Sequence, residues 1–139
     1  MVFRDADKKC RVDAKRRVAA WAKAVIEGHG KTAGEICVVS CSDEYLLGVN
    51  SKHLGHDYYT DIITFDYSDG EIVSGDLLIS FDRVKENAKE VGVSFQEELI
   101  RVIIHGCLHL VGFGDKTDAE AKQMREEENK ALNMFHVEQ

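Results

Sequence analysis

The stretch FQEELIRVIIHGCLHLVGFGD, residues 95–115, decides the fold of this chain. Over residues 95–111, apolar side chains recur at helical spacing and cover nearly the whole circumference of the helix they predict, which is typical of a helix buried on all sides. Ser94 and Glu97 have the spacing of a capping box at its start, and Gly112 can end it. The sequence therefore predicts a central buried helix that carries His105 and His109.

Shorter elements are expected on both sides of this helix. Strands are predicted at residues 2–4, 35–40, 60–66 and 71–79, and the turn-forming residues 67–70 join the last two as a hairpin. Helices are predicted at residues 11–27, 43–52, 81–91 and 118–135. Strands followed by a run of helices favour an α+β fold. We expect a single small domain, residues 1–139, with a mixed sheet of about four strands and helices packed over it.

The charge of the chain limits what it can bind. The 139 residues have a formal net charge of −7, which argues against a protein that coats polyanions. Basic residues outnumber acidic ones only in residues 1–36, so a contact with nucleic acid should be local; the Lys8–Arg17 cluster either touches RNA or is a solvated helix face. The N-terminus has no apolar leader, and the longest uncharged stretch, residues 102–114, is too short to cross a bilayer. A soluble, cytoplasmic protein without membrane contact is expected.

The cysteines and the tryptophan have no evident role in chemistry. The four cysteines form no CxxC pair and no recognisable disulfide framework, so reduced thiols are expected. Cys107 lies on the side of the central helix opposite the histidines and is predicted to be a core residue. Trp21 is likewise expected in the core and not as a platform for a nucleobase.

The two histidines of the central helix are candidate metal ligands. His105 and His109 are four residues apart, so they lie one turn above each other on the same side. Gly112 releases the chain just beyond them, and Asp115 can then return toward both imidazoles. Three protein ligands with an open fourth position are how a catalytic zinc is held, and such a metal activates its bound water. The alternative is a pair of hydrogen-bonded core histidines beside an ordinary acidic residue.

Metzincin proteases share this ligand spacing, in the signature HExxHxxGxxH. The glutamate after the first histidine is the general base of zinc proteolysis. Gly106 stands at that position here, so proteolysis is disfavoured.

Three segments together resemble the YbeY endoribonucleases, also called rRNA maturation factors. HGCLHLVGFGD, residues 105–115, is similar to the family's H-G-x-L-H-L-x-G-[YF] motif. TDIITF, residues 60–65, and GDLLIS, residues 75–80, followed by Val84 and Asn87-Ala88, are similar to two further family motifs. Met124-Arg125 and Glu127–Asn129 resemble the family's terminal helix. The resemblance runs in register over about residues 35–132.

The resemblance implies a metal-dependent endoribonuclease specific for single-stranded RNA. Such an enzyme acts in 3′-end maturation of small-subunit rRNA and in ribosome quality control. Its partners would be single-stranded RNA, the small-subunit rRNA 3′ region and the ribosome, and not DNA. The implied ligands of the zinc are His105, His109 and Asp115. The carboxylate also allows harder metals such as manganese.

The sequence departs from the family at two positions. Asp115 stands where the family more often has a third histidine, and its charge should make a bound water less acidic. Leu54 stands where many members have an arginine, a residue suited to phosphate. Lys52, His53 or His56 could replace that arginine.

A substrate groove is expected beside the metal, at Thr60, Asp61, His56 and Arg101. No side chain can be assigned as a general base from the sequence, and the reaction needs none if metal-bound hydroxide attacks directly. For Arg101, the alternative to an RNA contact is an ion pair with Glu97 or Glu98 on its own helix.

Two further alternatives concern the metal itself. Glu98 lies on the histidine side of the helix and could orient His105. The rival function is a non-catalytic ribosome-assembly factor with a structural metal, in which Cys37 or Cys41 would supply a fourth ligand.

Overall fold

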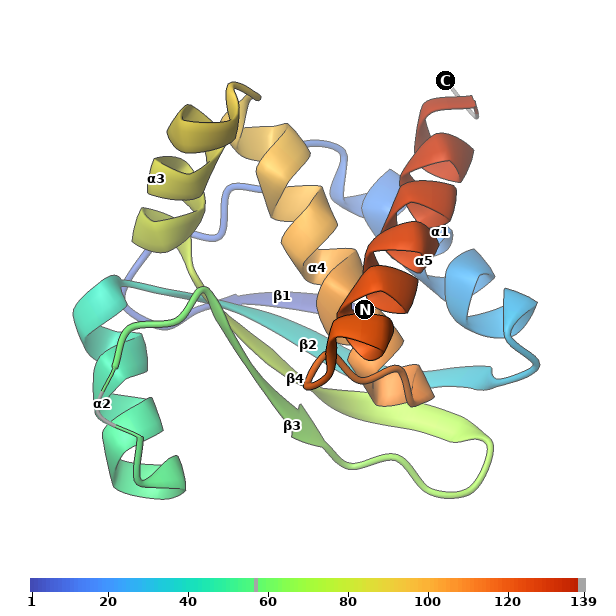
Figure 1. Ribbon diagram of the computed structural model, residues 1–139, viewed down its shortest axis with the longest axis horizontal. Helices are drawn as coiled ribbons and strands as arrows, with labels where there is room; N and C mark the ends of the chain where they lie inside the picture. Colours follow the sequence, from blue (N-terminus) through green and yellow to red (C-terminus); the bar gives the residue numbers. More distant parts are fainter. Residues whose placement is uncertain (57, 138–139) are drawn as a thin grey trace.

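The computed structural model of the chain describes residues 1–56 and 58–137. A four-stranded sheet with the order β1-β2-β4-β3 forms its centre (Figure 1). The strands β1 (Val2–Asp5), β2 (Thr32–Cys41) and β4 (Ile72–Ser80) are parallel, and β3 (Ile62–Asp66) is antiparallel to β4. The predicted mixed sheet and the hairpin of β3 and β4 are therefore confirmed. Strand β2 is longer than predicted because its first residue, Thr32, already pairs with Ile72.

Helices cover the two faces of the sheet unequally. Four of them, α1 (Lys15–Gly28), α3 (Phe81–Val91), α4 (Phe95–Val111) and α5 (Asp118–Val137), pack on one face, and α2 (Asp43–Leu54) packs on the other (Figure 1). Alternation along β4 explains the two layers: Leu77 and Ile79 belong to the large core under the four helices, and Leu78 packs in the small core under α2.

Helix α4 lies at the centre of the large core, as predicted. Leu99, Ile103, Ile104 and Leu108 on it are completely buried. The Ser94 hydroxyl accepts a hydrogen bond from the backbone N–H of Glu97, which caps the helix start. The helix thus presents a fixed row of side chains toward the sheet and toward α5.

Helix α1 begins later than predicted, at Lys15 instead of residue 11. Before it, Cys10 and Val12 are buried, and the backbone N–H of Asp13 donates to Gln96 Oε1, so this segment is held by tertiary contacts and not by a helical turn. Trp21 in α1 is a core residue as predicted: it is 1% exposed and its indole N–H donates to the carbonyl of Ala131.

The four cysteines form no disulfide in the part of the chain that the structure describes. All four cysteines are free, and Cys107 is completely buried in the large core. Burial raises the pKa of the Cys41 and Cys107 thiols to about 12. Over the part of the chain that the structure describes, none of the helices has both the length and the apolar character required to span a membrane.

Candidate metal centre

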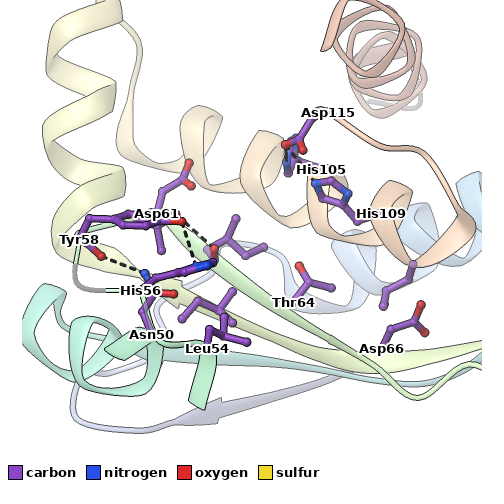
Figure 2. Close-up of a pocket in the computed structure, with 14 residues that line it drawn as sticks. Asn50, Leu54, His56, Tyr58, Asp61, Thr64, Asp66, His105, His109 and Asp115 are labelled. Carbon is purple, nitrogen blue, oxygen red and sulfur yellow. Dashed lines mark hydrogen bonds and ion pairs between the residues drawn. The ribbon is translucent and has the colours of Figure 1, made fainter. Parts of the chain in front are cut away.

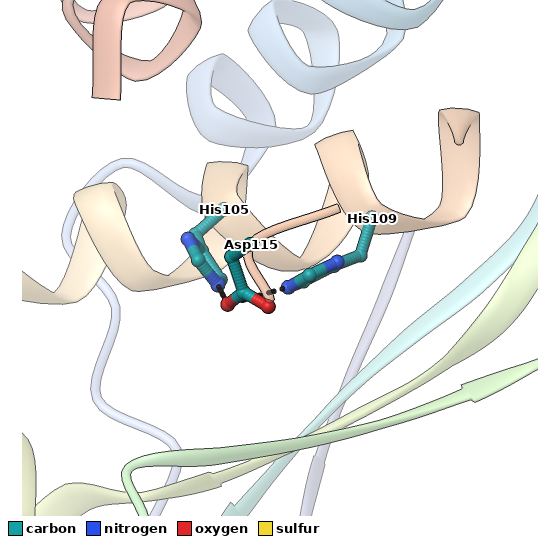
Figure 3. Close-up of side chains that lie close together, drawn as sticks. All are labelled: His105, His109 and Asp115. Carbon is teal, nitrogen blue, oxygen red and sulfur yellow. Dashed lines mark hydrogen bonds and ion pairs between the residues drawn. The ribbon is translucent and has the colours of Figure 1, made fainter. Parts of the chain in front are cut away.

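Helix α4 and the loop after it bring His105, His109 and Asp115 together (Figure 3). The two imidazole rings lie 4.5 Å apart between centroids at an interplanar angle of 82°. The helix ends at Gly112, whose φ of 127° turns the chain back toward the histidines. Asp115 Oδ2 then lies 3.5 Å from His105 Nε2 and 3.3 Å from His109 Nε2. The predicted triplet therefore converges in space.

The chemistry and spacing of these three side chains fit a zinc-sized ion. Two imidazole nitrogens and a carboxylate oxygen are common zinc ligands, and here all three ligand atoms lie within 4.8 Å of one another. Two ligands placed about 2.0–2.1 Å from a tetrahedral ion are separated by about 3.3–3.4 Å. The distances of 3.3 and 3.5 Å from Asp115 to the two histidines match this separation.

Among the described residues, no fourth His, Cys, Asp or Glu side chain joins the group of converging ligand atoms. Cys41 is buried under α2 in the small core on the opposite face of the sheet, and Cys37 lies on β2 facing a different cavity. Neither cysteine belongs to the group that could hold a metal. The arrangement is thus one of three ligands with an open side, the pattern of catalytic sites.

His105 has a second partner that the sequence reasoning missed. Its Nδ1 lies 2.7 Å from Oε2 of Glu128, a residue of α5 whose side chain is 7% exposed. Burial lowers the pKa of His105, but the hydrogen bond to Glu128 and its charge outweigh this effect, and the net shift is upward. Burial raises the pKa of Glu128, and His105 and Arg101 reverse the shift, so that its carboxylate is stabilised.

Two alternatives that the sequence left open for neighbouring side chains do not hold. Glu98 is not the residue that orients His105, because Glu128 occupies that place. Arg101 does not pair with Glu97 or Glu98; its Nη1 lies 2.8 Å from Glu128 Oε1. Both errors have one cause: α5 packs across α4 and supplies a partner that lies far away in the sequence.

A cavity of about 420 Å³ opens beside the triplet, between α4, β3 and the segment before β3 (Figure 2). Three of the predicted groove residues line it, Thr60, Asp61 and His56. Arg101 does not: it lines an adjoining cavity of about 240 Å³, which shares Asp61, His105 and Asp115 with the first. The predicted groove is thus divided over two neighbouring cavities.

The residues before β3 form the far wall of the larger cavity. The His56 ring stacks on Tyr58 with centroids 5.2 Å apart, and its Nδ1 lies 3.0 Å from the Tyr58 hydroxyl (Figure 2). Burial raises the pKa of the Asp61 carboxyl. Leu54 lines this cavity, whereas Lys52, His53 and the Lys8–Arg17 cluster are not among the lining residues.

The position of Gly106 explains why a protease base is missing. A Cβ atom at this residue would lie 2.8 Å from Ile62 Cδ1 and 2.8 Å from Leu77 Cδ2. Position 106 therefore packs directly on β3 and β4, and any side chain there would require the ends of the Ile62 and Leu77 side chains to shift.

The sheet, the central helix and the converging triplet define the class of protein: a small α+β protein with a three-residue candidate metal site at a cavity wall. Comparison with known proteins identifies the family. Residues 3–136 match the family model described as Endoribonuclease YbeY. The chain belongs to the YbeY endoribonuclease family.

Individual relatives agree with this assignment. The chain is 53% identical over 120 residues to the endoribonuclease YbeY of Bacteroides thetaiotaomicron, and the aligned region covers 86% of this chain and 88% of the relative. It is 48% identical over 128 residues to that of Flavobacterium johnsoniae, with 92% of each chain covered. A Thermotoga maritima protein solved in solution has the same fold, with a TM-score of 0.68 and 24% identity, over 99% of this chain and 91% of that one.

Proposed function

We propose that this chain is a metal-dependent endoribonuclease that cleaves single-stranded RNA. Its proposed substrate is the 3′ region of small-subunit rRNA, and its proposed roles are 3′-end maturation and ribosome quality control in the cytoplasm, with the ribosome or its small subunit as partner. The observation that carries the proposal is the convergence of His105, His109 and Asp115 at the wall of a cavity, in a chain of the YbeY family.

Each group near the cavity has a role in this proposal. His105, His109 and Asp115 hold one zinc ion, or manganese in its place. When bound, such a metal supplies an activated water and stabilises the charge that develops on a phosphate. Thr60, Asp61 and the His56 ring line the path of the RNA strand. We assign no side chain as a general base.

The test is cleavage of an end-labelled single-stranded RNA that carries a small-subunit rRNA 3′ sequence. Untagged protein is compared with two variants purified identically, Asp115→Ala and the control Asp118→Ala, an exposed acid just beyond the loop. We expect cleavage by the unaltered protein and the control, loss of cleavage in Asp115→Ala, and about one zinc ion per chain that this variant fails to retain. Equal cleavage by all three would reveal a contaminating nuclease and contradict the assignment.

One observation favours a second function, that of a non-catalytic ribosome-assembly factor with a structural metal. Leu54 lines the cavity at the position where the family resemblance implies an arginine, so no guanidinium is offered there to a phosphate. If neither zinc nor manganese supports cleavage by the unaltered protein, while the metal still binds, this second function replaces the first.

A further inference from the structure

Glu128 is unusual among the charged residues of this protein. Of the Asp, Glu, Lys and Arg side chains in the described part of the chain, it alone falls in the buried class. A buried carboxylate is strongly destabilising unless it is paired and hydrogen-bonded. Its partners therefore indicate why it is there.

The two carboxylate oxygens of Glu128 have different partners. Oε1 lies 2.8 Å from Arg101 Nη1 and 3.3 Å from Arg125 Nη1. Arg101 is itself held by Asn129, whose Oδ1 accepts from Nη2 at 3.0 Å. Two guanidinium groups are enough to offset the charge of one carboxylate. Oε2 nevertheless points elsewhere, to His105 Nδ1 at 2.7 Å.

The contact with Glu128 determines which nitrogen of the neutral His105 ring carries the proton. A carboxylate only accepts hydrogen bonds, so the proton of a neutral imidazole must be on Nδ1. The lone pair is then on Nε2, which faces Asp115 Oδ2 at 3.5 Å, on the side where the three candidate ligand atoms converge. Histidines that bind metals commonly donate their other ring N–H to a carboxylate in this way.

We propose that Glu128 is a positioning residue of the metal centre, which holds the His105 ring with Nε2 directed at the metal, and that Arg101 holds Glu128 in turn. The inference rests on the proposed metal site. It also gives Arg101 a role different from the RNA contact expected from the sequence. Helix α5, which contributes no metal ligand, thereby becomes part of the site.

The chain offers a matched control for this role. Glu127 is the neighbouring residue on α5. Like Glu128 it pairs with a basic side chain and a histidine, here Lys130 at 3.1 Å and His29 at 3.6 Å, and it is not one of the residues that pair with the triplet. Glu127→Ala therefore removes an equal charge and comparable pairs from the same helix. Glu128→Gln keeps the shape of the side chain and one acceptor oxygen, whereas Glu128→Ala removes the whole carboxylate.

The experiment measures the zinc dissociation constant of each protein by competition with a chromophoric chelator. We expect Glu128→Ala to bind zinc about 10–100-fold more weakly, Glu128→Gln to lose less, and Glu127→Ala to stay within about twofold of the unaltered protein. Thermal unfolding of the metal-free proteins separates a loss of zinc affinity from a loss of stability. Glu128→Ala with unchanged zinc affinity, or Glu127→Ala with an equal loss, would overturn the proposal.

A second measurement needs no variant at residue 128. Long-range ¹H–¹⁵N NMR of the zinc-loaded, unaltered protein should show His105 with its proton on Nδ1 and the metal on Nε2; metal on Nδ1 would overturn the positioning role. If the unaltered protein binds neither zinc nor manganese, the proposed function fails together with this inference. If it binds zinc and cleaves RNA but residue 128 has no influence on zinc affinity, only the inference fails.

Discussion

Replacing Gly75 by alanine should destabilise the protein, because Gly75 is where β4 meets both β3 and the end of α4. A Cβ atom at this position would overlap the carbonyl oxygen of Phe65 and come within 2.7 Å of Leu110 Cδ2. Alanine in a strand is otherwise favoured over glycine by about 0.5–1 kcal/mol. Overpacking a close-fitted contact costs about 1–3 kcal/mol, and here one of the atoms is backbone and cannot rotate away.

The balance of these effects is a net loss of about 1–2 kcal/mol, equivalent to a fall in Tm of roughly 3–8 °C for a chain of this size. Thermal unfolding followed by the fluorescence of the buried Trp21 measures it. Gly48→Ala is the control: a Cβ there meets no atom within 4 Å in the middle of α2, so stability should rise by about 0.5–1 kcal/mol. If Gly75→Ala is as stable as the unaltered protein, the argument from close packing is refuted.

Three further predictions concern the site, a helix cap and the thiols. Asp115→His removes a negative charge from the candidate metal site, so the pH profile of RNA cleavage should shift to lower pH; an unshifted profile would contradict this. Ser80→Ala removes a buried hydroxyl that caps α3 and donates to Asp43, and urea unfolding should show a loss of about 1–2 kcal/mol. The thiols of Cys41 and Cys107 have a pKa of about 12 in the folded protein and about 9 in the unfolded chain, so between these pH values only the unfolded thiols ionise. The free energy of unfolding should therefore fall as the pH rises above about 9. Both thiols of the folded protein should also resist alkylation at pH 8.

Much of the fold was predictable because its signals are local. The cap at Ser94, the stop at Gly112 and the apolar surface between them predicted α4 to the residue. The same local signals gave the metal triplet, whose members are separated by a helical turn and a short loop. The turn at residues 67–70 likewise predicted the hairpin of β3 and β4.

The errors arose where a residue is held by a distant segment. Glu128 lies in a helix so rich in charge that nothing in its sequence distinguishes a buried carboxylate from its exposed neighbours. The partner of Arg101 was sought one turn away, although α5 supplies it from across the interface. The start of α1 was placed too early because the chain before Lys15 is held in an irregular conformation, in which Cys10 and Val12 are buried.

The three candidate ligands lie between residues 105 and 115, so they remain near one another when the rest of the protein unfolds. The entropy lost on closing so short a loop is small, and the unfolded chain should therefore retain a measurable affinity for zinc. A metal that binds both the folded and the unfolded chain raises the free energy of unfolding by less than its dissociation constant for the folded protein would suggest. Thermal shifts produced by zinc should accordingly underestimate the affinity of the folded site, and the metal can associate with α4 before the sheet has formed.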